Sequence, residues 1–140
     1  VGNQEVGMSG KLEVLLLDDE PIVGQRLKSG LEKLGCGVEV FEDSVKALSR
    51  VREKTFDIII TDVMMAEVNG IEILEAAKKG NPQSKVIVIT GFATVSLARE
   101  AMEKGAFDMI AKPFKPSDLR SLVVKAAHEL GFTEISSEED

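Results

Sequence analysis

The stretch "LLLDDEP" at residues 15–21 joins an apolar run directly to three adjacent acids and a proline. Its leucines belong to the segment "LEVLLL" (12–17), whose continuous apolar character is typical of a strand that is buried on both faces. Carboxylates packed this closely repel one another and raise one another's pKa. At the end of this strand the acids therefore either extend into water or surround a positively charged group.

Short apolar runs like this one recur along the chain and alternate with helical patterns. The further predicted strands are "VEVF" (38–41), "FDIIIT" (56–61), "KVIVIT" (85–90) and "FDMIA" (107–111). The predicted helices run from Pro21 to Leu34 before Gly35, from a cap at Asp43 or Ser44 through Val51, from Gly70 to Lys79, from a cap at Thr94 to Gly105, and from Ser117 to Gly131. This alternation predicts an α/β fold with right-handed crossovers, a parallel sheet and helices on both faces.

The composition indicates one water-exposed globular domain. A chain of 140 residues has the length of a single domain, and a net charge of −7 argues against binding to nucleic acid or to an anionic membrane. Cys36 is the single cysteine, so no internal disulfide forms and a reducing cytoplasm is the expected location. We expect a flexible lead-in over residues 1–10, the domain over 11–131, and an acidic tail or truncated linker over 132–140.

Polar side chains follow four of the five predicted strands. They are Asp18, Asp19 and Glu20 after the first, Asp62 after the third, Thr90 at the end of the fourth and Lys112 after the fifth. Because parallel sheets bind ligands at the carboxyl ends of their strands, these side chains are expected to meet at one edge. Carboxylate oxygens suit Mg²⁺, while lysine and threonine suit phosphoryl oxygens. Asp62 is then a candidate nucleophile, because aspartate carboxylates form acyl phosphates.

Four motifs carry a resemblance to a known family. In chain order they are "LLLDDEP", "DIIITDVMM" followed by "NG", "VIVITG" and "GAFDMIAKPF". Over roughly residues 12–130 they resemble the receiver domains of bacterial two-component response regulators. The resemblance implies a flavodoxin-like, doubly wound sheet of five parallel strands in the order 2-1-3-4-5, with five helices. It also implies a phosphorylation-dependent signalling switch and not an enzyme acting on a separate substrate.

The resemblance assigns the acids to phosphoryl transfer and metal binding. Asp62 would accept a phosphoryl group from a sensor histidine kinase or a phosphotransfer protein. Asp19 and Asp62 would bind Mg²⁺ directly, together with the backbone carbonyl of Met64, and Asp18 would act largely through water.

The remaining implied roles concern the phosphoryl oxygens and the output. Thr90 and Lys112 would contact those oxygens, and the Lys112–Pro113 peptide bond would be cis. The face of the fourth helix, fifth strand and fifth helix (Val95 to Ala127) would change and control an output domain or a homodimer. No direct nucleic-acid or membrane contact is expected of this domain.

The sequence departs from the family pattern at two positions. Ala66 stands where the family usually has a proline four residues after the acceptor, which predicts a looser loop. Met109 stands where the family usually has a tyrosine or phenylalanine that rotates on activation, which predicts a weaker readout of the signal. Neither change affects the predicted phosphorylation chemistry.

Two other classes of protein remain open at this point. A phosphoaspartate hydrolase of the haloacid-dehalogenase type would require Asp-x-Asp after the first strand, but here the two aspartates are adjacent and Glu20 follows them. A receiver-like interaction module that is never phosphorylated is the third class.

Cys36, between two glycines, is interpreted as a passive small residue, and His128 as a surface residue of the last helix.

Overall fold

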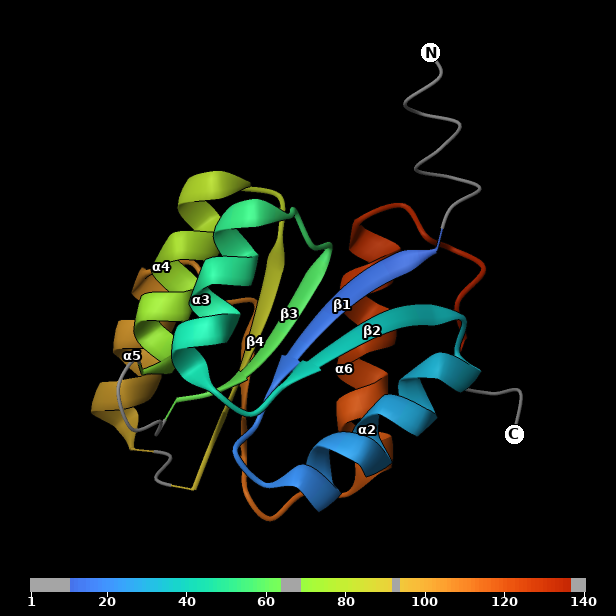
Figure 1. Cartoon of the computed structure of the whole chain (residues 1–140), viewed down its shortest axis with the longest axis horizontal. Coiled ribbons are helices and arrows are strands. Elements are labelled where there is room, and N and C mark those ends of the chain that lie inside the picture. Colours follow the sequence, from blue (N-terminus) through green and yellow to red (C-terminus); the bar gives the residue numbers. More distant parts are fainter. Residues whose placement is uncertain (1–10, 64–68, 92–93, 137–140) are drawn as a thin grey trace.

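The computed structural model describes residues 11–63, 69–91 and 94–136. Within these residues, five parallel strands form one sheet in the order β2-β1-β3-β4-β5, which confirms the predicted sheet and strand order (Figure 1). The strands are β1 (Leu12–Leu17), β2 (Cys36–Phe41), β3 (Ile58–Asp62), β4 (Lys85–Thr90) and β5 (Asp108–Ala111).

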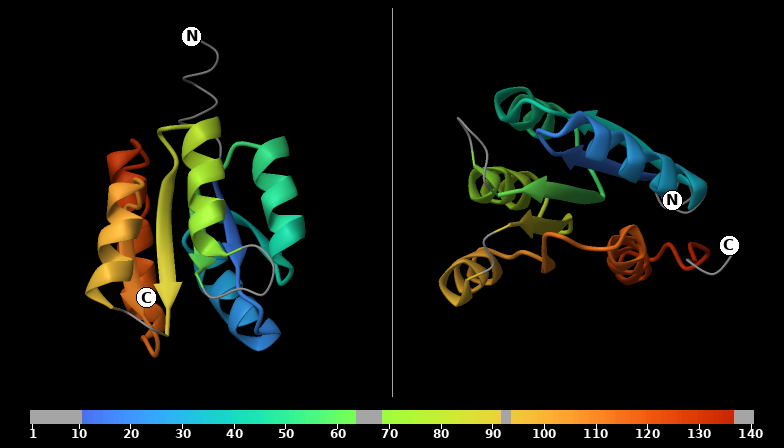
Figure 2. Two further views of the ribbon diagram at one scale, coloured as in Figure 1. Left: turned by 90° about the vertical axis from the view of Figure 1, so that its left-hand side faces the viewer. Right: turned by 90° about the horizontal axis from the view of Figure 1, so that it is seen from below.

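Helices cover both faces of the sheet. They are α2 (Pro21–Lys33), α3 (Ser44–Glu53), α4 (Gly70–Gly80), α5 (Val95–Glu103) and α6 (Pro116–Glu129). Figure 2 shows α5, α4 and α3 side by side on one face, and Figure 1 places α2 and α6 on the other. None of the helices in the described ranges is long and apolar enough to cross a membrane.

The continuous apolar strands follow from this three-layer arrangement. Successive side chains of a strand point to opposite faces. Leu15 and Leu17 accordingly join the apolar cluster beneath α3 and α4, whereas Val14 and Leu16 join the cluster beneath α2 and α6. The central positions of each inner strand therefore need apolar side chains on both faces, and the sequence supplies them, whereas the polar residues of these strands lie toward their ends.

Three strands differ from the prediction at their boundaries, since β3 ends at Asp62 and not at residue 61, β5 begins at Asp108 and not at residue 107, and the starts of β2 and β3 also move. β2 begins at Cys36 and not at residue 38, because Cys36 is buried and pairs in register with Leu12. β3 begins at Ile58 and not at residue 56. The side chain of Asp57 accepts a hydrogen bond from the backbone N–H of Glu13 at 2.8 Å, and its own N–H donates to the Glu13 carbonyl at 2.9 Å. This exchange fixes Asp57 against the start of β1 before the regular strand begins.

Helix starts follow the expected capping chemistry with one shift. Asp43, and not Ser44, caps α3, because its Oδ1 accepts from the N–H groups of the second and third residues of the helix at 2.8 and 3.2 Å. Thr94 caps α5 as predicted, through Oγ1 and the Leu97 N–H. α6 begins at Pro116, one residue before the predicted start, since proline suits the first helical position.

The segment after α6 folds back onto the domain. The helix ends before Gly131, as predicted, and Gly131 adopts a φ of 98° in the left-handed region. Phe132 and Ile135 then pack against the cluster beneath α2 and α6. The exposed His128 donates from Nε2 to the Ile135 carbonyl at 2.7 Å. The first residues of the predicted tail therefore contact the core, and the domain boundary at residue 131 stays a prediction.

Candidate functional site

The predicted acids meet at the carboxyl edge of the sheet. Asp18 follows β1 directly, Asp19 comes next, and Asp62 is the last residue of β3. One carboxylate oxygen from each of the three lies within 4.8 Å of the others. The adjacent strands β1 and β3 thus bring together residues that are more than forty positions apart in the sequence, as the alternating pattern predicted.

Asp18 has an oxygen that needs a cation. The residue is fully buried, and its Oδ1 accepts the backbone N–H of Glu20 at 2.8 Å. Its Oδ2 is also buried and accepts no hydrogen bond from the described residues. Burial raises the pKa of Asp18, although the Glu20 N–H and the charge of Lys112 oppose the shift. A buried carboxylate oxygen without a hydrogen bond is costly, so the site favours a bound positive charge.

Lys112 is the cation that the chain itself supplies. Its Nζ donates to Asp62 Oδ2 at 2.8 Å and lies 3.4 Å from Asp18 Oδ2 and 3.5 Å from Glu20 Oε1. Burial lowers the pKa of Lys112, but the hydrogen bond to Asp62 and the charges of Asp18 and Asp62 outweigh it, so the net pKa is raised. Lys112 therefore stays charged at neutral pH and holds the Asp62 carboxylate in place.

The donor set fits Mg²⁺. Among the described residues, the ammonium of Lys112 lies near the carboxylates of Asp18, Glu20 and Asp62, and Asp19 adds a further carboxylate to the group, so negative charge remains in excess. Hard carboxylate oxygens are the ligands that Mg²⁺ prefers, and Asp19 is exposed to solvent at the rim, where an ion can enter. The predicted fourth ligand, the carbonyl of Met64, lies outside the described residues, so its role stays a prediction.

Backbone contacts bring Thr90 and Lys112 to the same edge. Thr90 is the last residue of β4, is fully buried and pairs with Ala111 of β5. The N–H of Lys112 donates to the Thr90 carbonyl at 2.8 Å. The Lys112–Pro113 peptide bond is cis, as predicted. The structure thus brings the acids, Lys112 and the end of β4 at Thr90 to the same edge of the sheet, as the sequence predicted.

Gly70 was expected only to begin a helix, and its close packing against the end of β3 was not predicted from the sequence. It begins α4 after the cap at Asn69, and its N–H donates to the Val63 carbonyl at 3.1 Å. A Cβ atom at Gly70 would lie 2.6 Å from the Asp62 carbonyl oxygen and 2.7 Å from the Val63 Cα. Only glycine permits this approach of helix to strand. The dipeptide "NG" that follows the predicted strand of Asp62 was the available signal.

Two further residues stand where the sequence placed them. Met109 lies on β5, half-buried against the cluster beneath α3 and α4, where the partly buried Leu97 of α5 also packs. Cys36 is buried, and burial, with the charges of Asp57 and Glu13, raises the pKa of its thiol to about 11. The thiol is therefore unreactive at neutral pH. Ala66 and Phe92 lie outside the described residues.

The sequence and the fold both match one known family. Residues 14–124 match the response regulator receiver domain, so the protein belongs to this family of two-component signalling domains. Transcriptional regulatory protein ZraR of Klebsiella oxytoca is 35% identical over 130 residues, which are 92% of this chain and 29% of that protein. A putative response regulator NtrX-like of Rickettsia typhi is 35% identical over 118 residues, which are 83% of this chain and 25% of that protein. The chain thus spans less than a third of the length of these relatives.

Solved structures show the same fold. A CheY-like response regulator receiver domain protein from Methanospirillum hungatei JF-1 superposes with a TM-score of 0.81 and 28% identity, covering 86% of this chain and 96% of that one. The beryllofluoride-activated NtrC4 receiver domain dimer gives a TM-score of 0.72 and 31% identity, covering 83% and 93% of the two chains.

Proposed function

We propose that this receiver domain is a phosphorylation-dependent switch whose phosphoryl acceptor is Asp62. The donor is a phosphohistidine of a sensor kinase or a phosphotransfer protein. The observation that carries the proposal is the geometry around Lys112, which holds the Asp62 carboxylate at 2.8 Å beside the buried Asp18 Oδ2. That arrangement presents a fixed nucleophile and leaves a place for a cation next to it.

The proposed transfer uses groups of this chain. An oxygen of Asp62 attacks phosphorus, the acyl-phosphate O–P bond forms, and the P–N bond of phosphohistidine breaks. The histidine nitrogen leaves with the electron pair and takes a proton from solvent. Lys112 and Thr90 then bind two of the phosphoryl oxygens. Asp19, Asp62 and the Met64 carbonyl would hold Mg²⁺ directly and Asp18 would hold it largely through water, and the ion would supply positive charge that offsets the charge of the phosphoryl oxygens.

The proposed output uses the face formed by α5, β5 and α6. Val95 and Met102 of α5 are 75% and 49% exposed and give this face apolar surface that a partner could cover. A solved relative with 31% identity is a receiver dimer in its beryllofluoride-activated form, and the curated relatives are several times longer than this chain. We therefore propose that the face forms a homodimer or contacts an output domain, in the cytoplasm.

One experiment separates this function from the two alternatives. The protein is incubated with acetyl phosphate, with and without Mg²⁺, and is weighed intact by mass spectrometry. The switch predicts one stable addition that depends on Mg²⁺. Rapid release of inorganic phosphate over many turnovers would indicate a hydrolase, and the absence of any addition would indicate an interaction module that is not phosphorylated.

Asp19→Ala should weaken Mg²⁺ binding while leaving the nucleophile in place. Loss of groups that merely orient a metal ligand typically costs about 10–100-fold in affinity, so loss of the ligand itself should cost at least about tenfold. Titration of Mg²⁺ by isothermal calorimetry measures the change. Glu20→Gln is the matched control, since it removes one charge beside the cluster without removing a member of the three-carboxylate group. An equal loss in both variants would contradict ligation by Asp19.

The phosphorylated form should be long-lived. In the family, residues two positions after the acceptor and two after the threonine tune hydrolysis, and here these are Met64 and Phe92. Neither side chain can orient the attacking water. We expect the Met64→Asn, Phe92→Glu double variant to lose the phosphoryl group at least about tenfold faster, because an oriented water reacts faster. Phosphate release after removal of the donor measures both rates, and equal rates would contradict the prediction.

Met109→Tyr should strengthen the response of the output face. The flexible thioether of methionine can pack in both the unphosphorylated and the phosphorylated conformation with little energetic penalty. The two conformations therefore differ little in packing energy at this position. A ring at this position should add about 0.5–1.5 kcal/mol to the difference. Sedimentation with and without beryllofluoride measures the gain in dimer affinity, and Met109→Leu is the control without a ring. Equal gains in wild type and Met109→Tyr would show that Met109 does not limit the coupling.

A further inference from the structure

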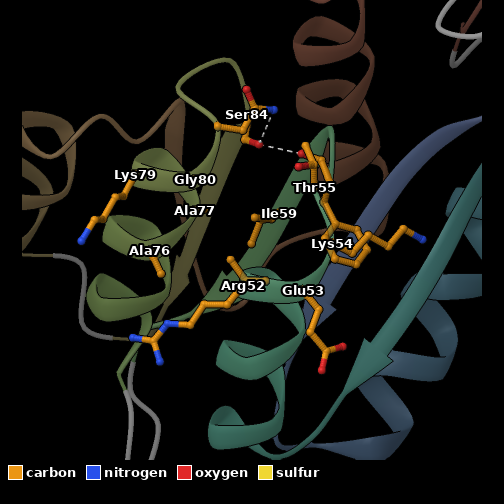
Figure 3. A pocket seen from close by; sticks show the side chains of 13 residues that line it. Arg52, Glu53, Lys54, Thr55, Ile59, Ala76, Ala77, Lys79, Gly80 and Ser84 are labelled. Atoms are coloured by element: carbon orange, nitrogen blue, oxygen red, sulfur yellow. Dashed lines mark hydrogen bonds between the residues drawn. The ribbon is translucent and has the colours of Figure 1, made fainter. Parts of the chain in front are cut away.

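Thr61 places a hydroxyl inside the apolar layer beneath α3 and α4. The residue comes directly before Asp62 on β3 and is fully buried. Its partners in register are Leu17 on β1 and Val88 on β4, and both belong to the apolar cluster of this face. Figure 3 shows Ile59, two residues earlier on the same face, directed from β3 toward α4. A hydroxyl in such surroundings is costly unless it forms a hydrogen bond.

The hydrogen bond of Thr61 is made to the backbone of the proposed phosphoryl acceptor. Its Oγ1 donates to the Asp62 carbonyl at 3.0 Å. Because successive side chains of a strand point to opposite faces, the hydroxyl holds Asp62 from the face opposite to its carboxylate. A valine would fill the same space beside Leu17 and Val88 without burying a hydroxyl. Packing alone therefore does not require the hydroxyl, whereas the hydrogen bond to Asp62 does.

The same backbone is held at two further points. The N–H of Gly70 donates to the Val63 carbonyl at 3.1 Å, on the far side of the peptide that joins Asp62 to Val63. The carboxylate of Asp62 is held by Lys112, whose Nζ lies 2.8 Å from Oδ2. Thr61 fixes the carbonyl between these two points. A rotation of this peptide would turn the Asp62 backbone and move its carboxylate relative to Lys112.

We propose that Thr61 is a positioning residue for phosphoryl transfer, whose hydroxyl fixes the Asp62 peptide and so sets the direction of the Asp62 carboxylate. This inference rests on the proposed function of Asp62. Thr61 lies on the opposite face and contacts neither the phosphoryl group nor the metal ion. It acts by keeping the nucleophile in a narrow range of orientations, and a small misplacement of a reacting group slows a reaction strongly.

Two variants separate positioning from stability. Thr61→Val keeps the shape of the side chain and removes the hydroxyl, and the buried methyl group offsets the lost hydrogen bond. Thr61→Ser keeps the hydroxyl and removes a buried methyl group, so its melting temperature should fall by about 4 °C. We expect Thr61→Val to melt no lower than Thr61→Ser. A purely structural role would make the less stable variant the slower one, and positioning predicts the reverse order.

The rate of phosphoryl uptake from acetyl phosphate at saturating Mg²⁺ measures the effect. Intact mass is followed over time at a temperature well below both melting transitions. We expect Thr61→Val to lower the maximal rate about tenfold at an unchanged half-saturating donor concentration, and Thr61→Ser to stay within about twofold of wild type. A wild-type rate in Thr61→Val would overturn the proposal. An equal loss in both variants would assign the effect to packing and also overturn it.

A titration with Mg²⁺ repeats the comparison without a phosphoryl donor. Asp62 is a proposed ligand, so a misdirected carboxylate should weaken Mg²⁺ binding about tenfold in Thr61→Val and less than about twofold in Thr61→Ser. Isothermal calorimetry measures both changes, and equal affinities in all three proteins would overturn the proposal. A wild type that gains no phosphoryl group would refute the proposed function, and the order of Mg²⁺ affinities would still decide the role of Thr61.

Discussion

We expect the Asp62→Asn variant to gain no phosphoryl group from acetyl phosphate, under conditions in which the wild type gains one. The amide is not a nucleophile, and it also loses the charge that Lys112 neutralises at 2.8 Å. The fold should survive, because an amide oxygen can still accept the Lys112 hydrogen bond. Intact mass after incubation with the donor and Mg²⁺ measures the effect.

Asp108→Asn is the control for this variant. Asp108 lies on the neighbouring strand β5, outside the three-carboxylate group, and accepts a hydrogen bond from the Met109 N–H. An asparagine side chain can keep that bond, so phosphoryl uptake should stay at the wild-type level. Uptake by Asp62→Asn at the wild-type level would show that the acceptor is a different residue.

Gly70→Ala should destabilise the domain more than other single-methyl additions on α4. The new Cβ would lie 2.6 Å from the Asp62 carbonyl oxygen and 2.7 Å from the Val63 Cα, which are backbone atoms that cannot rotate away. Forcing such a contact should cost about 2 kcal/mol of the free energy of unfolding, or roughly 4–8 °C in melting temperature for a domain of this size. Urea unfolding followed by circular dichroism measures the loss.

The same helix offers a matched control at its other end. Gly80→Ala places a methyl group where no heavy atom lies within 4 Å, so it should leave stability unchanged or raise it by up to about 1 kcal/mol through helix propensity. If both variants unfolded at the same urea concentration, the close approach of α4 to the end of β3 would be contradicted. Gly70→Ala should also slow phosphoryl uptake, since the clash is with the backbone of Asp62.

The polar edge of the sheet could be predicted from the sequence because it depends only on where each strand ends. A parallel strand puts its carboxyl end at the same edge as its neighbours, so the residue after each apolar run is placed once the run is recognised. Asp18, Asp62, Thr90 and Lys112 all followed this rule. Strand boundaries were less certain, because Asp57 and Cys36 take their places from contacts with β1 that the pattern of a single segment does not contain.

Features that depend on packing between elements could not be predicted. The burial of Asp18 Oδ2 without a hydrogen bond depends on where Lys112 arrives from a distant strand. The close approach at Gly70 depends on how α4 is seated on β3. Each of these becomes visible only when the elements are assembled.

The central claim is that Asp62 carries the phosphoryl group, and borohydride reduction tests it most directly. An acyl phosphate on aspartate is reduced to homoserine, which marks the acceptor permanently. The wild-type protein is treated with acetyl phosphate and Mg²⁺, reduced, digested and mapped by tandem mass spectrometry. We predict homoserine at position 62, with none in a sample prepared without the donor. Homoserine at Asp18 or Asp19, or none in the treated sample while the intact mass shows an addition, would contradict the account.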